Sequence, residues 1–402
     1  MAKQNKPAIR FKGFTDAWEQ RKLSEIADKV TEKNAGLQYI ETFTNSAEFG
    51  IISQRDFFDH DIAKMSSLSG YYIVRNEDFV YNPRISTSAP VGPINRNKLG
   101  RIGVMSPLYT VFRPHDVDTT YLEYFFKSKY WHSFMNFNGD SGARSDRFSI
   151  KDSVFFEMPI PLPYIEEQRK IGEHLTQLDH LITLHQRKYD KLQVLKKAML
   201  EKMFPKNGSS VPEIRFKGFT DAWEQRKLGD CFTERCESMP DGELISVTIN
   251  DGIKKFSELG RHDNSNDDKS KYKKVCAGDI AYNSMRMWQG ASGCSPYEGI
   301  VSPAYTVLTP NSGINSKCMA YQFKLPATIH TFKINSQGIT SDNWNLKFPA
   351  LSEIDIYVSP YEQEQAKIAA YFANLDHLIT LHQRELEKLQ NIKKSMLEKM
   401  FV

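Results

Sequence analysis

The sequence contains no long apolar run and no segment of the secretory type. None of its apolar runs approaches the roughly 18–20 residues that a membrane helix needs, and residues 1–14 are polar and basic without an apolar centre. The five cysteines all lie in the second half of the chain, at Cys231, Cys236, Cys276, Cys294 and Cys318. This odd, uneven number favours reduced thiols over a disulfide framework. We therefore expect a cytoplasmic protein that does not associate with a membrane.

Enzyme motifs are also missing. The sequence has no GxxxxGK[ST] nucleotide loop, no HExxH or GxSxG motif and no paired CxxC. His174, His180 and His185 lack i,i+4 spacing, and no neighbouring cysteine or carboxylate pattern completes a zinc site around them. We expect neither catalysis nor a bound metal or cofactor in this chain.

Charge of one sign is scarce. The 402 residues include 53 lysines and arginines and 49 acidic residues, a formal net charge of +4. The stretch from Ala8 to Leu162 holds 19 basic and 19 acidic residues, and that from Glu213 to Ser359 holds 17 and 18. This balance neither requires nor excludes a nucleic-acid partner. A DNA-binding surface would have to be a local patch, such as Lys269, Lys271, Lys273 and Lys274.

What the sequence does contain is a duplication. Residues 9–23 and 214–228 are identical, and residues 163–204 match residues 360–401 at 27 of 42 positions. The intervening segments share only short landmark motifs: residues 77–82 recur as 278–283, residues 103–111 as 299–307, and Ser141-Gly142 as Gln337-Gly338. Two similar surfaces therefore accompany two divergent ones. An uneven drift of two duplicated halves would give the same pattern. We expect a first recognition domain at 1–162, a helix at 163–204, a linker at 205–212, a second recognition domain at 213–359 and a helix at 360–402.

The repeated segments at 163–204 and 360–402 have the spacing of coiled-coil helices. Their seam residues alternate in steps of four and three, an average of 3.5, and about 40 helical residues span roughly 60 Å. The seam includes Leu178, Ile182 and His185, repeated as Leu375, Ile379 and His382. Because a whole domain separates the two helices, they can pair antiparallel with pseudo-twofold symmetry.

Polar residues interrupt this seam at matching positions. His185 and Lys196, with His382 and Lys393, either control register and partner contacts or form a solvated edge of the seam. A second apolar stripe runs beside it and could bury against the domains or against a partner, and its members are Leu181, Leu184, Leu195, Leu200, Leu378, Leu381, Ile392 and Leu397.

The intervening segments are mixed α/β, so the fold class is α+β. Aromatic and β-branched runs predict strands at 71–74, 79–81, 109–112 and 154–156. Thr119 or Thr120 could cap a helix that carries Leu122, Phe125, Phe126, Tyr130 and Phe134 on one face. The corresponding stretch of the second half, 317–325, is broken at Pro326.

Polar loops follow the landmarks of both segments. Their arginine, serine, asparagine and aromatic residues suit base-edge and phosphate contacts, although ordinary solvated loops have the same composition. The candidate DNA-binding residues are Tyr81, Asn82, Arg84, Ser86, Arg96, Arg144, Arg147, Tyr282, Asn283, Arg286, Trp288, Asn343 and Trp344.

These features together resemble the specificity subunit of type I restriction–modification enzymes. The resemblance rests on two divergent domains between repeated segments with long heptad helices, and on Pro-x-x-Glu-Gln at the start of each helix (Pro163, Glu167 and Gln168; Pro360, Glu364 and Gln365). It covers essentially the whole chain. The halves depart from each other where Glu77 replaces Gly278 and where Thr340 replaces Arg144.

The resemblance implies a non-catalytic subunit whose two domains each read one half of a split, asymmetric site in double-stranded DNA. The helices would set the gap. Two modification subunits would methylate adenine N6 with S-adenosylmethionine, and two motor-nuclease subunits would use ATP and magnesium. Candidate partner and scaffold residues are Phe14, Trp18, Leu178, Ile182, His185, Phe219, Trp223, Leu375, Ile379 and His382. A self-sufficient methyltransferase or nuclease and a coiled-coil adaptor without DNA are the alternatives.

Overall fold

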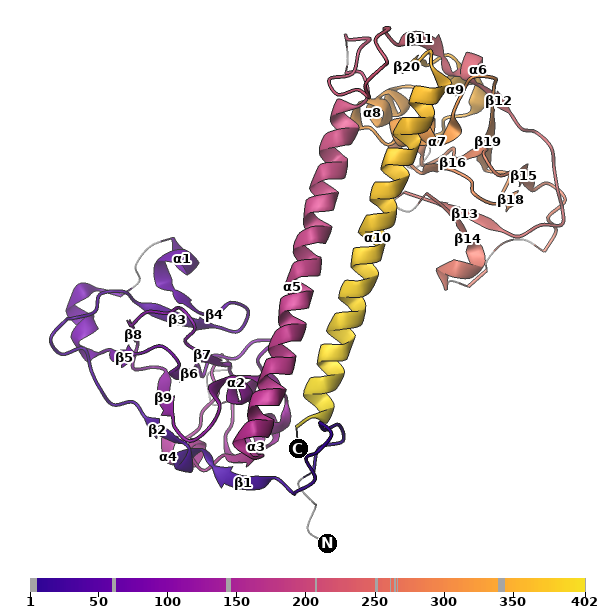
Figure 1. The fold of residues 1–402 in the computed structure, drawn as a ribbon. Coiled ribbons are helices and arrows are strands. Elements are labelled where there is room, and N and C mark those ends of the chain that lie inside the picture. The colour runs from indigo at the N-terminus through magenta and orange to yellow at the C-terminus, as the bar shows by residue number, and fades with distance from the viewer. Residues whose placement is uncertain are drawn as a thin grey trace. The chain divides into compact units, whose positions relative to one another are not determined.

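The chain folds as two compact units. The computed structural model describes residues 6–59, 63–141, 146–206, 208–249, 252–260, 262–263, 265, 267–338 and 344–401. Unit 1 comprises Met1–His185 with Glu385–Val402, and unit 2 comprises Gln186–Arg384 (Figure 1). The predicted recognition domains at 1–162 and 213–359 therefore each lie within one unit. Each long helix contributes one part to each unit.

Unit 1 contains ten strands and the start of the first long helix among its described residues. Its strands are β1 (Glu19–Lys22), β2 (Ala27–Lys29), β3 (Phe43–Ser46), β4 (Gly50–Ser53), β5 (Tyr72–Val74), β6 (Phe79–Tyr81), β7 (Ile94–Arg96), β8 (Gly103–Met105), β9 (Thr110–Pro114) and β10 (Pro159–Leu162). Its helices are η1 (Leu23–Glu25), α1 (Gln54–Phe58), η2 (Met65–Gly70), α2 (Thr119–Lys127), α3 (Tyr130–Asn138), α4 (Asp152–Phe155) and the first part of α5 (Ile165–Lys202).

Unit 2 repeats this order of elements with small variations. Its strands are β11 (Glu224–Lys227), β12 (Phe232–Glu234), β13 (Ile245–Thr248), β14 (Gly252–Lys255), β15 (Lys273–Val275), β16 (Ile280–Asn283), β17 (Ser292–Cys294), β18 (Gly299–Val301), β19 (Tyr305–Pro310) and β20 (Asp355–Val358). Its helices are α6 (Leu228–Cys231), η3 (Phe256–Leu259), η4 (Met287–Gln289), α7 (Ser316–Gln322), α8 (Pro326–Ile334), α9 (Phe348–Ser352) and the first part of α10 (Glu362–Lys399).

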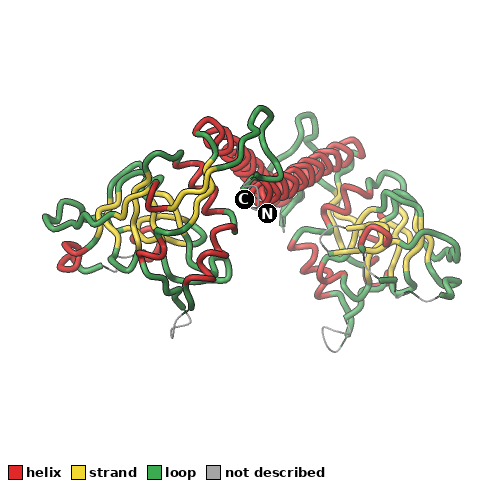
Figure 2. Tube along the Cα trace, turned by 90° about the horizontal axis from the view of Figure 1, so that it is seen from below, coloured by secondary structure: helices red, strands yellow, loops and turns green. Residues whose placement is uncertain are grey.

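The two units share one sheet topology. A four-stranded antiparallel sheet has the order β2-β9-β6-β7 in unit 1 and β12-β19-β16-β17 in unit 2. Three two-stranded antiparallel pairs accompany each sheet, and Figure 2 shows the strands at the centre of each unit with helices around them. This twofold mixed architecture confirms the predicted fold class.

The repeated Glu-Gln-Arg-Lys segment closes each unit. In unit 1 it forms β1, which pairs with β10 so that Glu19 lies opposite Leu162. In unit 2 it forms β11, which pairs with β20 so that Glu224 lies opposite Val358. The start of each unit is thus bonded to the strand that directly precedes its long helix.

The Glu-Gln pair at the start of each long helix binds the rest of its unit. The guanidinium of Arg10 donates to both oxygens of the fully buried Glu167 at 2.7 and 2.8 Å, and Arg215 donates to Glu364 at 2.6 and 2.8 Å. The neighbouring glutamine Oε1 accepts from the N-cap backbone of an earlier helix of the unit. In unit 1 the N-cap of α2 donates, Asp118 N to Gln168 at 2.9 Å. Asn315 N donates to Gln365 at 2.8 Å in unit 2. The motif therefore fixes each domain on its helix.

Within each unit, segments of the two long helices run antiparallel. Lys393 Nζ lies 2.5 Å from Asp179 Oδ1 in unit 1, and Lys196 Nζ lies 2.5 Å from Asp376 Oδ1 in unit 2. The predicted seam residues are all buried or partly buried. The two seam lysines are therefore paired with carboxylates of the facing helix, which favours the register interpretation for them.

Three local predictions were wrong. Residues 152–155 form helix α4 and not a strand, since Phe155 N donates to Lys151 O at 2.8 Å and Phe156 N to Asp152 O at 3.0 Å. The single helix expected after Thr119 divides into α2 and α3, with Ser128 and Lys129 between them. Its cap is Asp118, whose side chain accepts from Tyr121 N at 2.8 Å.

Candidate nucleic-acid interface

In each unit, two loops far apart in sequence are hydrogen-bonded to each other. The first of these loops starts at the end of β6 in unit 1 and at the end of β16 in unit 2. In unit 1, Arg84 and Arg147 form an antiparallel bridge, and Phe148 N donates to Pro83 O at 2.7 Å. In unit 2, Leu346 N donates to Ser284 O at 2.9 Å. We call each of these places a loop junction: residues 82–86 with 146–148 in unit 1, and 283–289 with 344–346 in unit 2. Each junction joins the two landmark loops that the sequence singled out.

The junction of unit 1 presents arginines. Arg84, Arg147 and Ser86 are exposed. Among the described residues, neither guanidinium has an ion pair or a side-chain hydrogen bond, whereas Arg75, Arg101 and Arg113 are paired with Glu32, Glu41 and Asp78, in that order. The junction of unit 1 therefore carries two arginines whose positive charge no carboxylate among the described residues offsets. Arg144 lies outside the described residues.

The junction of unit 2 presents a different surface. Arg286 and Met285 are exposed, and the half-buried rings of Trp288 and Trp344 meet edge to face at 5.2 Å. Trp288 Nε1 donates to Met285 O at 3.1 Å, and Lys333 Nζ lies 5.4 Å from the Trp344 ring. Unit 2 thus offers one guanidinium beside apolar and aromatic groups. Asn343 lies outside the described residues.

The asparagines of the two junctions shape the backbone. Asn82 Oδ1 accepts from Arg84 N at 2.9 Å and its Nδ2 donates to Asn45 O at 2.7 Å. Asn283 Oδ1 likewise accepts from Met285 N at 3.0 Å. Because a side chain that bonds the backbone two residues on forms an Asx turn, both residues hold their loop in place.

The tyrosines before these asparagines are interior residues. Tyr81 is 3% exposed and its hydroxyl donates to Val91 O at 3.0 Å, and Tyr282 is fully buried. Burial raises the pKa of both phenols. These two positions support the strand that carries the junction, so the candidate surface is built from the other residues.

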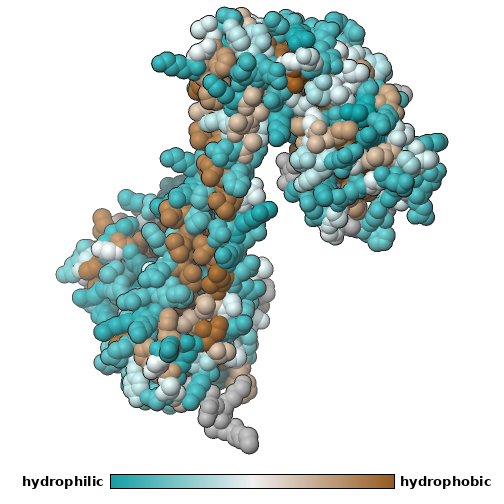
Figure 3. All heavy atoms as spheres, turned by 45° about the vertical axis from the view of Figure 1, so that its right-hand side comes forward, coloured by the Kyte–Doolittle hydropathy of each residue, from teal (hydrophilic) through white to brown (hydrophobic). Residues whose placement is uncertain are grey.

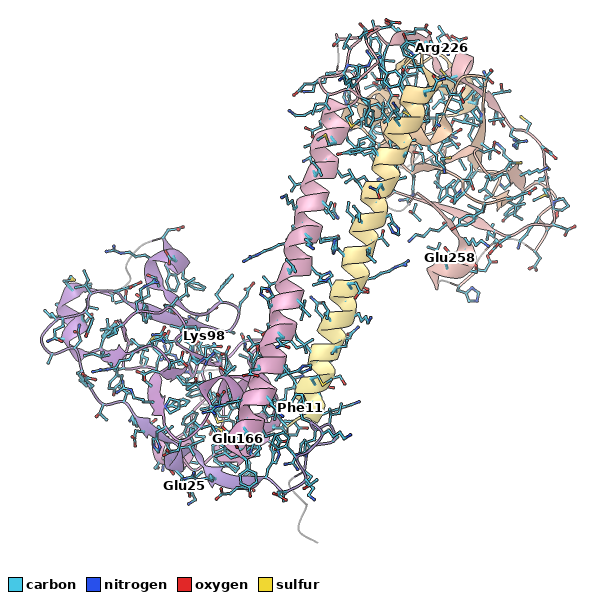
Figure 4. All side chains as sticks on the ribbon, viewed as in Figure 1. Phe11, Glu25, Lys98, Glu166, Arg226 and Glu258 are labelled. Carbon is cyan, nitrogen blue, oxygen red and sulfur yellow. The ribbon has the colours of Figure 1, made fainter. Side chains whose placement is uncertain are left out.

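Arg96 is enclosed in an ion-pair cluster of unit 1. Its side chain is 10% exposed, and its two Nη atoms lie 3.0 Å from Glu77 Oε2 and 2.6 Å from Glu123 Oε2. Glu123 also accepts from Lys98 at 2.8 Å and from Lys127 at 2.7 Å (Lys98 is labelled in Figure 4). Burial alone would raise the pKa of Glu123, but the three cations outweigh it and hold the pKa at about 2. Arg96 therefore stabilises the fold. Its enclosed side chain does not support the prediction that it contacts DNA.

The cluster also explains the departure at Glu77. Glu77 has a φ of 72° and Gly278 a φ of 95°, a backbone region that favours glycine. The Glu77 carboxylate accepts from Thr119 Oγ1 at 2.5 Å and from Arg96. These bonds offset the backbone cost of a side chain at this position.

The lysine run of unit 2 is largely neutralised. Lys273 donates to Glu234 at 3.3 Å, and Lys274 donates to Glu237 at 3.1 Å. Lys269 and Lys271 are the two members left without a carboxylate partner among the described residues. The predicted basic patch is therefore smaller than the sequence indicated.

The candidate partner residues divide into buried and accessible groups. Trp18 and Trp223 are each 3% exposed and belong to the cores of their units. Phe14 and Phe219 are partly exposed, with Lys170 Nζ 5.0 Å from the first ring and Lys367 Nζ 4.9 Å from the second. The seam residues predicted for this group, from Leu178 to His382, are buried or partly buried on the long helices.

Part of the second apolar stripe remains on the surface. Leu181 and Leu184 in unit 1 and Leu381 in unit 2 are 39–45% exposed, and Figure 3 shows apolar surface along the helices. Leu195, Leu200, Ile392 and Leu397 pack against the cores of their own units. A groove of about 600 Å³ in unit 1 is lined by Tyr130, Ile182, Lys393 and Leu397, among others.

Some residues that shape the site carried no sequence signal. Asn45 in β3 donates to Val80 O at 2.7 Å, and its Oδ1 accepts from Asn95 at 2.7 Å, so it links the strands around the junction of unit 1. In unit 2, Lys324 donates to Gly290 O at 2.5 Å and to Ile249 O at 2.9 Å. Burial lowers the pKa of Lys324 to about 8. These contacts join segments that are distant in sequence, so no local pattern predicts them.

Among the described residues, no group of three or more histidine, cysteine, aspartate or glutamate side chains is arranged to hold a metal ion. Within the same part of the chain, no helix combines the length and apolar character needed to cross a membrane.

The chain is similar to known proteins over nearly its whole length. Residues 15–194 and 220–391 each match the family described as the type I restriction modification DNA specificity domain. The type I restriction enzyme MjaVIII specificity subunit of Methanocaldococcus jannaschii is 25% identical over 324 residues, which cover 74% of this chain and 73% of that protein.

A solved structure shows the same fold. The type I restriction-modification system S subunit from M. genitalium has a TM-score of 0.60 and 14% identity, with 99% of both chains covered. The HsdS subunit from Thermoanaerobacter tengcongensis has a TM-score of 0.46 and 14% identity, with 96% of both chains covered.

Proposed function

Because the chain belongs to the type I restriction modification DNA specificity family, we propose that each of its units reads one half of a split, asymmetric site in double-stranded DNA. The single observation that carries this proposal is one scaffold with two different loop junctions. Arg84 and Arg147 mark the junction of unit 1, whereas Arg286, Trp288 and Trp344 mark that of unit 2. Arginine and aromatic side chains on a rigid frame suit the reading of base edges.

The proposed DNA contacts are the accessible residues of the junctions. They are Arg84, Ser86 and Arg147 in unit 1 and Arg286, Trp288 and Trp344 in unit 2, with Arg144 and Asn343 kept as predictions from the sequence. Asn82 and Asn283 position these residues through their backbone bonds. Tyr81, Tyr282 and Arg96 support the frame from the interior.

The long helices are proposed to set the gap between the two halves of the site. Both helices are continuous over 38 residues and pair antiparallel within each unit. The Glu-Gln pair fixes each domain to one helix through buried bonds. The number of helical residues between the two recognition domains would then determine the distance between the half-sites.

The repeated surfaces are proposed to hold two copies of a modification subunit in the cytoplasm. The exposed leucines Leu181, Leu184 and Leu381 and the partly exposed Phe14 and Phe219 are the accessible apolar groups of the repeats. Adenine methylation would take place on those partners, with S-adenosylmethionine bound there. Motor-nuclease subunits with ATP and magnesium would join the same assembly.

Deletion of one heptad from each helix tests the proposal. Removing residues 183–189 and 383–389 keeps the alternation of the seam and both lysine–aspartate pairs. Mapping of methylated adenines in cells that hold this chain and its modification partner should show unchanged half-sites and a changed gap. Altered half-sites with an unchanged gap would contradict the proposed role of the helices.

The matched control replaces a domain and keeps the helices. Exchange of residues 29–161 for the corresponding segment of another family member should change one half-site and leave the gap unchanged.

Binding of the unaltered chain to duplex DNA should fall steeply with rising salt, since phosphate contacts release counterions. Binding that does not depend on salt would favour a non-DNA ligand.

A further inference from the structure

We propose that Arg84 and Arg147 form one reading element that recognises two neighbouring guanines in the half-site of unit 1. This inference rests on the proposed DNA-recognition function and adds the chemistry of the bases. It assigns one guanine to each guanidinium.

The backbone of the junction holds the two arginines side by side. Arg84 and Arg147 are bridge partners, and the flanking bonds are Ile85 N to Asp146 O at 3.0 Å and Phe148 N to Pro83 O at 2.7 Å. Directly opposite residues of an antiparallel pair have Cβ atoms about 4.5–5.5 Å apart. Successive bases of one DNA strand are about 3.4 Å apart. Two long side chains that start this close can therefore reach adjacent bases.

The shape of the junction suits the major groove. It consists of two loop segments joined by an isolated antiparallel bridge, and the major groove admits a two-stranded ribbon of this kind. Asn82 stiffens one of the two segments through its bond to Arg84 N, and Asn45 anchors Asn82 in turn. A rigid base for both side chains lowers the conformational entropy that binding would cost.

The charges of the junction indicate a ligand that is rich in acceptors. Like charges directly opposite each other on paired strands destabilise the pairing. Two other exposed arginines of unit 1 are offset by a carboxylate, Arg75 by Glu32 and Arg101 by Glu41. In the described part of the chain, Arg84 and Arg147 have no such partner. The compensating group is therefore expected to come from the bound molecule.

Guanine is the base that matches this pair best. Its O6 and N7 atoms are two acceptors at the major-groove edge, and a guanidinium binds both at once. Adenine and thymine each combine one acceptor with a donor or a methyl group at that edge. Two adjacent arginines thus favour two adjacent guanines on one strand.

The experiment compares four single variants by methylation mapping and by duplex binding. Arg84→Ala should relax one guanine of the target and Arg147→Ala the neighbouring one, each with about a 5- to 150-fold loss of preference at that position. Arg84→Lys keeps the charge and loses the two-pronged donor, so it should relax the same guanine while total affinity for DNA changes little. Arg75→Ala, at an exposed arginine that is paired with Glu32, is the control and should leave the target unchanged.

Two results would overturn the inference. One is a target in which the positions affected by Arg84→Ala and Arg147→Ala are not adjacent guanines. The other is an equal loss of affinity for every DNA sequence with the target unchanged, which would make the arginines phosphate contacts. The proposed function fails separately, if the unaltered chain and its modification partner methylate no split site.

Discussion

Units 1 and 2 agree in how they are built and differ in what they present. Tyr124 donates to Asp179 at 2.8 Å in unit 1, and Tyr321 donates to Asp376 at 2.8 Å in unit 2. The accessible side chains of the loop junctions share no such match, since paired arginines stand in one unit and an indole pair in the other. The difference teaches that duplication preserved the contacts between domain and helix while the surface of the junctions changed.

A second difference lies beneath the surface. Glu123 in α2 gathers Arg96, Lys98 and Lys127 in unit 1, whereas unit 2 has Ala320 at the corresponding place. There Lys324 donates to two backbone carbonyl groups. An ionic cluster therefore surrounds α2 in unit 1, whereas neutral backbone acceptors hold the lysine that follows α7 in unit 2.

The largest effect is expected from Glu123→Ala. It leaves three cations without their shared carboxylate, and breaking a buried ion pair costs about 3–5 kcal/mol. Denaturant unfolding of the whole chain, with hydrogen exchange to locate the change, should show lower stability in α2 and its surroundings. Glu298→Ala, at an exposed residue of unit 2, is the control, and equal effects of both variants would remove the contrast between the units.

As the pH falls, helix α2 of unit 1 should open before helix α7 of unit 2. A folded-state pKa of about 2 for Glu123, below its ordinary 4.5, means that this carboxylate stabilises the fold fully above about pH 4.5. The stabilisation, roughly 3 kcal/mol, is lost as the pH falls from there toward about 2. Hydrogen exchange between pH 5 and 3 should show α2 opening before α7. Simultaneous opening of both helices would argue against the cluster as the cause.

Several parts of the fold were predictable from the sequence because they rest on local patterns. The four-three alternation predicted both long helices, and aromatic runs predicted β5, β6 and β9. β1 was missed because Glu19–Lys22 has no strand-like composition and exists as a strand only through β10. Its pairing partner lies far along the chain, so tertiary contacts define it.

The candidate site divides in the same way. The junction loops follow repeated landmarks of the sequence, and Arg84, Arg147 and Arg286 are exposed there. Their contact with DNA stays a prediction. Arg96 could not be separated from them by sequence, because its partners Glu77 and Glu123 come from other elements. Only packing decides which arginine of such a group remains available.

A smaller effect is expected where the helices pair. Lys393→Glu would place two carboxylates together at Asp179, in a position of 24–32% side-chain exposure. The loss in unfolding free energy should be about 1–3 kcal/mol, between the values for exposed and buried pairs. Adding Asp179→Lys should restore most of it. Lys196→Glu in unit 2 should lower the free energy of unfolding by a similar amount. If only one of the two variants lowers it, the two lysine–aspartate pairs are not equivalent.

The smallest effect concerns one carbonyl group that each unit satisfies differently. Tyr121 Oη donates to Pro161 O at 2.5 Å in unit 1, and Gln322 Nε2 donates to Tyr357 O at 2.9 Å in unit 2. These carbonyls occupy matching positions of β10 and β20. Tyr121→Phe and Gln322→Leu should each cost about 1 kcal/mol in denaturant unfolding. If only one of the two variants lowers the free energy of unfolding, the matching carbonyl groups do not make the same contribution to stability in the two units.

The central claim is that each unit reads its own half of a split DNA site. It is tested most directly by a chain in which residues 213–359 replace residues 8–162, so that both domains are copies of the second one. Methylation mapping with the modification partner should then give a symmetric target, with two inverted copies of one original half-site and the original gap. Persistence of the original asymmetric target would contradict the account.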